Sequence, residues 1–260
     1  MLHSDSLVVQ GSESSNTEVP LFVDCWQGRS GAGRTLLIVH GMGEHGGRYA
    51  HVPKFLGEDF ERFYAMDQRG HGRSGGLRGY APNFDTYVED LKRVVDEILK
   101  ERAVPFEAAI ISAPLRGVSL KVPAYKKALG ELLGRTLSKV QLTNEVNPSY
   151  LSHDPAIVEA YVKDRLVHAK ITPRLYLDMT AAMDWVNAQS GPLACPTLFL
   201  VPGDDRVVSS ATTVAFFRNL KYREKDLREY PGMFHEVMNE IGKEKVFEDI
   251  RKWLAPKLNN

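Results

Sequence analysis

Short apolar runs alternate with amphipathic segments along most of the chain, a pattern typical of a parallel β-sheet covered by helices. Continuous apolar runs predict strands at 35–41, 61–67, 108–114 and 197–203. The first of them, TLLIVHG, predicts a strand that is buried on both faces. A more polar run at 225–232 predicts a strand at the edge of the sheet. The pattern therefore indicates an α/β fold with a mostly parallel central sheet flanked by helices.

Two helices are predicted by apolar residues that recur every three or four positions. One follows Asn83, which can cap its first turn. Its apolar stripe consists of Phe84, Tyr87, Val88, Leu91, Val94, Val95, Ile98 and Leu99. The other lies near 243–254 and ends before Pro256, with its inward face formed by Val246, Ile250, Trp253 and Leu254.

Residues 116–190 differ from the rest of the chain, because amphipathic stretches such as 124–137 and 154–166 follow one another there without a strand signal. An insertion of this kind after the third predicted strand indicates a helical cap. Such a cap would cover the carboxyl ends of the strands, where open α/β sheets bind their ligands. We therefore expect a core formed by residues 1–115 and 191–260 and a cap, or lid, formed by residues 116–190.

Composition and charge exclude several function classes. The chain has 33 basic and 33 acidic residues, so its charge gives no argument for a nucleic-acid partner. Neither Cys25 nor Cys195 has the spacing of a metal ligand, and we expect no metal or organic cofactor. The polar N-terminus lacks the apolar segment of a signal peptide, and no stretch approaches a membrane span. We therefore expect a cytoplasmic protein.

Three stretches carry residues that could take part in catalysis. Residues 39–49, VHGMGEHGGRY, form a Gly-rich turn whose exposed backbone N–H groups suit an oxyanion hole, or a turn without chemistry. Asp204 and Asp205 follow the fourth predicted strand, where a carboxylate can orient a histidine or cap a helix. His235 lies in the loop before the terminal helix. This is the chain order of an α/β-hydrolase, once a serine stands between the turn and the aspartate.

Several motifs make the chain similar to a known family. They are HGMGEHGGRY, DQRGHGRSGG, NPSYLSHDP, LVHAKITPR and GDDRVV followed by HEVMNE, and they extend over nearly the whole chain from about residue 19. In these motifs the chain resembles the monoacylglycerol lipase and lysophospholipase branch of the α/β-hydrolases, which are serine hydrolases. The resemblance implies an α/β-hydrolase fold that hydrolyses single-chain acyl esters and binds the acyl chain with its lid.

The resemblance also implies roles for individual residues. Met42 would supply one backbone N–H of the oxyanion hole. Asp205 and His235 would be two members of a Ser-His-Asp triad. Glu44 and Arg48 would line the place where the alcohol part of the ester binds.

The serine of this triad is not supplied by the stretch that fits the motif Gly-x-Ser-x-Gly. Residues 72–76, GRSGG, fit that signature of a nucleophile elbow, but an elbow needs a buried strand directly before the serine and a helix directly after it. Ser74 follows the polar DQRGHGR and precedes GGLRGYAPN, whose glycines and proline oppose a helix. The resemblance assigns these residues to the loop after the second core strand. We therefore interpret Ser74 as a false motif match.

The segment that should carry the elbow is too short in this chain. In relatives a buried strand, a Gly-x-Ser-x-Gly turn and a long helix lie between the helix that ends near Arg102 and the strand at 108–114. Here only AVPFE, residues 103–107, joins the two, whereas the missing elements need about two dozen residues. Neither Ser112 nor Ser119 has the elbow glycines. The sequence therefore predicts that one central strand and helix are absent, that no nucleophile is present, and that the chain as written is nearly inactive.

Three functions stay open at this point. A serine ester hydrolase agrees with the motifs, and its substrate would be a small acyl ester. A non-catalytic relative that binds an acyl ligand or a partner agrees with the missing elbow, although the retention of Asp205 and His235 argues against it. Peptidases and epoxide hydrolases share the fold. An enzyme of lipid metabolism would contact a membrane surface transiently through its cap, but no basic amphipathic face marks such a surface. The oligomeric state is left open.

Overall fold

The computed structural model describes residues 4–10, 19–31, 33–99, 106–117, 119, 133–134, 137–144 and 146–258. They belong to two compact units, which are described separately. Unit 1 comprises residues 1–103, 125–145 and 164–179, and unit 2 comprises residues 104–124, 146–163 and 180–260.

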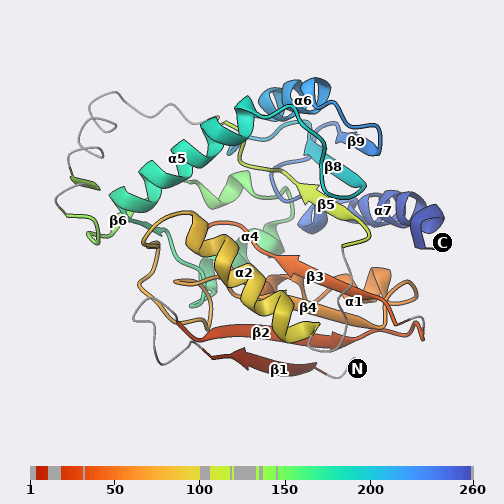
Figure 1. Cartoon of the computed structure of the whole chain (residues 1–260), viewed down its shortest axis with the longest axis horizontal. Helices are drawn as coiled ribbons and strands as arrows, with labels where there is room; N and C mark the ends of the chain where they lie inside the picture. Colours follow the sequence, from red (N-terminus) through yellow and green to blue (C-terminus); the bar gives the residue numbers. More distant parts are fainter. Residues whose placement is uncertain are drawn as a thin grey trace. The chain divides into compact units, whose positions relative to one another are not determined.

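Unit 1 contains a four-stranded sheet in the order β1-β2-β4-β3 (Figure 1). Its strands are β1 (Ser4–Val9), β2 (Leu21–Gln27), β3 (Thr35–Val39) and β4 (Arg62–Met66). β3 and β4 are parallel, whereas β1 and β4 both run antiparallel to β2. The strands predicted at 35–41 and 61–67 are thus confirmed. The sequence pattern missed β1 and β2, in which polar residues interrupt the apolar ones.

β3 is less buried than its sequence predicts. Burial on both faces was expected, but Thr35 is exposed, Val39 is 46% exposed and the residues between them are half-buried. β3 is an outer strand of its sheet and pairs with β4. An outer strand has a neighbour on one side only, so its side chains are covered less than those of a central strand. The expectation of full burial was wrong for this reason.

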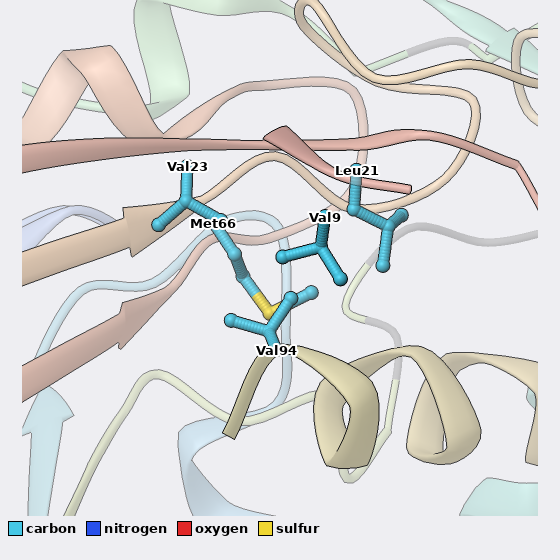
Figure 2. Close-up of a cluster of buried hydrophobic side chains, with 5 residues drawn as sticks. All are labelled: Val9, Leu21, Val23, Met66 and Val94. Atoms are coloured by element: carbon cyan, nitrogen blue, oxygen red, sulfur yellow. The ribbon is translucent and has the colours of Figure 1, made fainter. Parts of the chain in front are cut away.

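The core of unit 1 lies between this sheet and α2 (Asp85–Ile98). Figure 2 shows how a side chain of α2 points toward apolar side chains of β1, β2 and β4. This cluster consists of Val9, Leu21, Val23, Met66 and Val94, none of which is more than 7% exposed. Burying one such side chain contributes about 1.5–3 kcal/mol. The Asn83 side chain accepts a hydrogen bond from the Thr86 backbone N–H at 2.9 Å and caps the first turn, as predicted.

Unit 1 also contains η1 (Gly46–Tyr49), α1 (Val52–Leu56) and an antiparallel pair formed by β6 (Leu142–Thr143) and β7 (Lys170–Ile171). The pair lies within the region 116–190, for which no strand was expected. A backbone hydrogen bond from Asn144 N to Ala169 O continues the pairing. Strands of two residues are too short to give a periodic pattern, which explains why the sequence did not predict them.

Unit 2 contains a parallel sheet in the order β5-β8-β9. Its strands are β5 (Ala109–Ser112), β8 (Thr197–Pro202) and β9 (Lys225–Tyr230). These confirm the strands predicted at 108–114, 197–203 and 225–232, and β9 is at the edge as expected. The central strand β8 is buried throughout. Its Phe199 and Val201 pack against Phe216 and Leu220.

The helices of unit 2 are η2 (Pro148–Tyr150), α4 (Pro155–Lys163), α6 (Ser210–Asn219), η3 (Val237–Asn239) and α7 (Lys243–Leu258), and α5 (Pro173–Ala188) has residues in both units. The helix expected at 154–166 is therefore confirmed. The one expected at 124–137 lies largely outside the described residues. The terminal helix does not end before Pro256 but continues past it. Because this proline is in the last turn, its missing N–H costs one hydrogen bond and no later turn depends on it.

Candidate active site

The Asp205 side chain lies in unit 2, in the turn after β8, and none of it is exposed. Its Oδ1 accepts hydrogen bonds from the backbone N–H groups of Val207 at 2.8 Å and Val208 at 2.9 Å. Its Oδ2 lies 2.8 Å from Nδ1 of His235. Since two backbone groups fix the carboxylate, it can hold the imidazole ring in one orientation. The neighbouring Asp204 is 50% exposed and pairs with Arg206 instead.

His235 lies in the loop between β9 and η3, and its side chain is 23% exposed. The loop contains Gly232, whose φ of +76° suits glycine. With Nδ1 against the carboxylate, the neutral ring carries its proton on Nδ1, and Nε2 is the nitrogen that can accept one. The two unit 2 residues predicted for a triad are thus brought together in the geometry of an acid–base pair.

The predicted oxyanion turn lies in unit 1 and is held by the buried carboxylate of Glu44. This carboxylate accepts hydrogen bonds from Gly41 N at 2.7 Å, Arg48 Nη1 at 2.6 Å and the Tyr49 hydroxyl at 3.0 Å. Burial alone would raise the pKa of Glu44, but the adjacent Arg48 guanidinium and the hydrogen bonds hold that pKa below its ordinary value. Glu44 is therefore a charged group that fixes the local backbone.

Met42 is fixed from both sides by this arrangement. Gly41 on one side donates to Glu44, and the carbonyl of Gly43 on the other accepts from the His168 N–H at 2.9 Å. A backbone fixed before reaction is what an oxyanion-hole donor requires. The role of Met42 as such a donor stays a prediction. The side chains of Glu44 and Arg48 are 10% and 8% exposed and bind each other. Their predicted contact with the alcohol part of a substrate stays a prediction.

Ser74 is 5% exposed, and its hydroxyl is hydrogen-bonded to backbone groups of the protein. The oxygen accepts a hydrogen bond from Phe22 N at 2.8 Å, and the hydroxyl donates to the carbonyl of Asp67. Ser74 lies in a run of turns and bends between β4 and α2, not at a strand-to-helix turn. These contacts support its interpretation as a structural residue. Of the other serines considered, Ser112 ends β5, and Ser119 donates to the backbone carbonyl of Asp205 at 3.4 Å.

Sequence reasoning missed a group of three histidines in unit 1, of which His40 and His71 are buried and His168 is half-buried. The ring centroids of His40 and His71 are 5.2 Å apart, and those of His71 and His168 are 4.7 Å apart. Burial, followed by the nearby His40, lowers the pKa of His71 to about 3, so the ring is neutral. Its Nδ1 lies 2.9 Å from the carbonyl of Arg69. All three residues occur in the motifs quoted above, and that was the available signal. In the described part of the chain, no group of three or more potential ligands could hold a metal ion.

An open pocket of about 540 Å³ lies in unit 2 beside the residue that precedes His235. It is lined by Ser149, Ser152, His153, Pro155, Val158, Glu159, Val162, Lys163 and Phe234. Its size is that of a small-molecule site. Much of the lining comes from α4, in which no residue is buried and Val162 is 65% exposed.

A protein family described as serine aminopeptidase, S33, matches the chain over residues 31–105 and 97–242. The chain belongs to this family of α/β-hydrolases. The two matches overlap at residues 97–105, next to the short connection between α2 and β5. None of the helices that the structure describes is both long and apolar enough to cross a membrane.

Individual proteins to which the chain is similar bear on its resemblance to the monoacylglycerol lipase branch. An uncharacterized abhydrolase domain-containing protein of Dictyostelium discoideum is 28% identical over 87% of the chain, which spans only 27% of that relative. The monoacylglycerol lipase of Mycolicibacterium smegmatis is 26% identical over 92% of this chain and 94% of its own length. The crystal structure of a Paleococcus ferrophilus monoacylglycerol lipase matches with a TM-score of 0.78 and 26% identity, covering 92% of this chain and 99% of its own. The α/β-hydrolase fold expected from the sequence, and the resemblance to this branch, are thus confirmed.

Proposed function

We propose that this α/β-hydrolase is a carboxylic ester hydrolase that acts on single-chain acyl esters of the monoacylglycerol or lysophospholipid type. The observation that carries the proposal is the 2.8 Å contact between Asp205 and His235, with the carboxylate wholly shielded from solvent. The monoacylglycerol lipases to which the chain is similar support the substrate class.

Each residue has a defined step in this proposal. His235 Nε2 takes the proton of a serine hydroxyl as the serine attacks the ester carbonyl, and returns it to the alcohol that leaves. It then takes a proton from the water that attacks the acyl-serine, and returns that proton to the serine as the acid is released. Asp205 keeps the ring in the correct tautomer and stabilises the imidazolium that forms. The Met42 N–H holds the negative charge on the carbonyl oxygen of the tetrahedral intermediate. Glu44 keeps the turn in shape for that task.

The serine of this mechanism would belong to a segment that the relatives have and this chain lacks. Two findings support a missing segment. The alignment with the Mycolicibacterium smegmatis lipase is 265 positions long, although only 92% of this chain's 260 residues take part, so the lipase carries positions without a counterpart here. The family matches the chain in two stretches that meet at residues 97–105.

As written, the chain would then be nearly inactive, because an intact dyad without a nucleophile loses most of the rate enhancement of a triad. A second candidate function follows from the missing elbow segment. A relative without an elbow could serve only to bind an acyl compound or a partner.

Residues 116–190 are proposed to form the lid of the ester hydrolase. The open pocket along α4 and the exposed Val162 support contact of this region with an apolar ligand or a lipid surface.

The experiment that tests the proposal is the intact mass of the purified protein, measured before and after reaction with a fluorophosphonate probe. A mass well above 29.1 kDa with one probe adduct would show that a segment with a reactive serine belongs to the protein. Hydrolysis of a short p-nitrophenyl ester should then fall to near background in His235→Ala. A mass of 29.1 kDa without adduct, and no hydrolysis, would favour the binding function. Hydrolysis that survives His235→Ala would overturn the dyad.

A further inference from the structure

Glu240 is a buried charged residue to which the proposed mechanism gives no role. It follows η3 in unit 2, and its side chain is 2% exposed. Its Oε1 accepts hydrogen bonds from His153 N at 2.8 Å, Ile241 N at 2.7 Å and the Ser152 hydroxyl at 3.1 Å. Its Oε2 accepts from Phe234 N at 3.1 Å and lies 2.9 Å from His153 Nδ1. The carboxylate thus gathers donors from a turn before α4 and from the residue that precedes His235.

The charge of this carboxylate is stabilised by its donors. Burial would raise the pKa of Glu240, but the hydrogen bonds from Ile241, His153 and Phe234 hold it below its ordinary value. The rings of His153 and Phe234 also stack, with centroids 3.6 Å apart. The hydrogen bonds and the stack therefore join the same two segments.

Three consecutive backbone N–H groups of the His235 loop are held by this part of unit 2. Glu240 binds the first of them, at Phe234. The next two donate to the carbonyls of Tyr150 at 3.4 Å and Leu151 at 2.9 Å. The Phe234 N–H donates to the charged carboxylate of Glu240, whereas the other two N–H groups donate to neutral carbonyls. Hydrogen bonds to charged groups are about twice as strong as neutral ones.

We propose that Glu240 is a positioning residue for His235, which fixes the backbone entering the base and ties that loop to the turn at Ser152 and His153. Asp205 orients the ring, whereas Glu240 determines where the loop places it. The inference rests on the proposed function, in which His235 is the base. Its consequence for catalysis follows from geometry, because a displacement of about 1 Å at a catalytic group can cost about 100-fold in rate.

The substitution Glu240→Gln isolates this role. It preserves the size of the side chain but turns one carboxylate oxygen into an NH₂ group. An NH₂ group cannot accept a hydrogen bond, so one set of donors around the side chain loses its acceptor. Glu240→Asp keeps the charge but shortens the reach by one methylene, and should give a smaller effect.

The test is ¹⁵N-histidine NMR of the full chain, with the downfield Nδ1 proton of His235 assigned by its loss in His235→Ala. In Glu240→Gln we expect this signal to shift and its proton to exchange with water about tenfold faster, as loss of a charged hydrogen bond predicts. Trp253→Phe is the matched control: it removes the 2.8 Å hydrogen bond to Asp226 in the same unit and should lower stability without moving the signal.

The outcomes separate this inference from the proposed function. A His235 signal that depends on Asp205, yet is unchanged in folded Glu240→Gln, would overturn the positioning role and leave the ester hydrolase standing. A signal that Asp205→Asn leaves unchanged would overturn the dyad itself. If Glu240→Gln does not fold, the same comparison is made with Glu240→Asp, whose unchanged signal would equally contradict the positioning role.

Discussion

Oδ2 of Asp205 lies 2.8 Å from Nδ1 of His235, while the other carboxylate oxygen is occupied by two backbone N–H groups of its own loop. The carboxylate therefore has a structural role beside its proposed catalytic one. Asp205→Ala should lower the free energy of unfolding by about 2–4 kcal/mol, because it leaves these buried donors without an acceptor. Urea denaturation measures the change.

Asp204→Ala is the matched control for this prediction. It removes the same group one residue earlier, but Asp204 is 50% exposed and pairs with Arg206 at the surface. Its effect should stay within about 0.5 kcal/mol. Equal effects of the two substitutions would contradict the structural role of Asp205.

Ser74→Ala should destabilise the protein without changing its reaction with a fluorophosphonate probe. The Phe22 N–H loses its acceptor, which costs about 1–3 kcal/mol for a buried donor. Ser149→Ala, at an exposed serine whose hydroxyl donates to Asn147, is expected to change stability by less than about 0.5 kcal/mol. If Ser74→Ala instead abolished a probe adduct seen in the parent protein, Ser74 would be the nucleophile and its interpretation as a false match would be wrong.

The buried His71 predicts sensitivity to acid. Its pKa is lowered to about 3 in the folded protein by burial and by the nearby His40, whereas an unfolded histidine has a pKa of about 6.5. Between these values the unfolded chain binds a proton that the folded chain does not. Stability is thus fully present above about pH 6.5 and falls with decreasing pH by up to about 1.4 kcal/mol per pH unit. The pKa of His40 is also lowered by burial, which adds to the effect.

Urea denaturation of His71→Phe at several pH values between neutral and about 4 tests this prediction. The variant loses the hydrogen bond to the Arg69 carbonyl and should be less stable at neutral pH. Its stability should nevertheless fall less steeply with acid than that of the parent protein, since one proton fewer is taken up on unfolding. A slope identical to that of the parent would contradict the neutral state of His71.

Much of the fold could be read from the sequence, because buried strands leave continuous apolar runs. The strands β4, β5 and β8 follow such runs closely. The pattern failed where tertiary context decides. β3 is a continuous apolar run, as a central strand would be, yet its position as an outer strand leaves Val39 exposed. β6 and β7 are held by pairing across the chain rather than by any local periodicity.

In the candidate site, too, some residues are marked by the sequence pattern and others only by tertiary contacts. An aspartate of the pair 204–205 and His235 were candidates because both follow predicted strands in a recognisable order, and the resemblance to the family singled out Asp205. Glu240 was not singled out, although it ends the quoted motif HEVMNE, because a glutamate in a loop near the C-terminus has by itself the signal of a surface residue. Its partner Ser152 is 88 positions away in the sequence, and only the fold brings the two within hydrogen-bonding distance.

Arg69 and Asp90 connect the loop that contains Ser74 to α2 through a buried ion pair. The guanidinium Nε lies 2.5 Å from Oδ2 of Asp90 and Nη2 lies 2.8 Å from Oδ1, with side chains 6% and 1% exposed. Asp90→Ala should cost about 3–5 kcal/mol, because it removes a buried carboxylate that binds the buried Arg69 and also Arg93 at 3.0 Å. Urea denaturation is again the measurement.

A second aspartate on the same helix supplies the control. Asp96 pairs with Lys92 at 2.5 Å, but the two side chains are 61% and 75% exposed. Solvent already stabilises both charges, so Asp96→Ala should change stability by less than about 0.5 kcal/mol. The two ion pairs are similar in length and differ in burial, so a large difference between the variants would attribute the cost to the loss of the buried carboxylate and of its bonds to Arg69 and Arg93. A loss of less than about 1 kcal/mol in Asp90→Ala would instead mean that water reaches Arg69 once its partner is removed, and that the loop is not anchored to α2 by this pair.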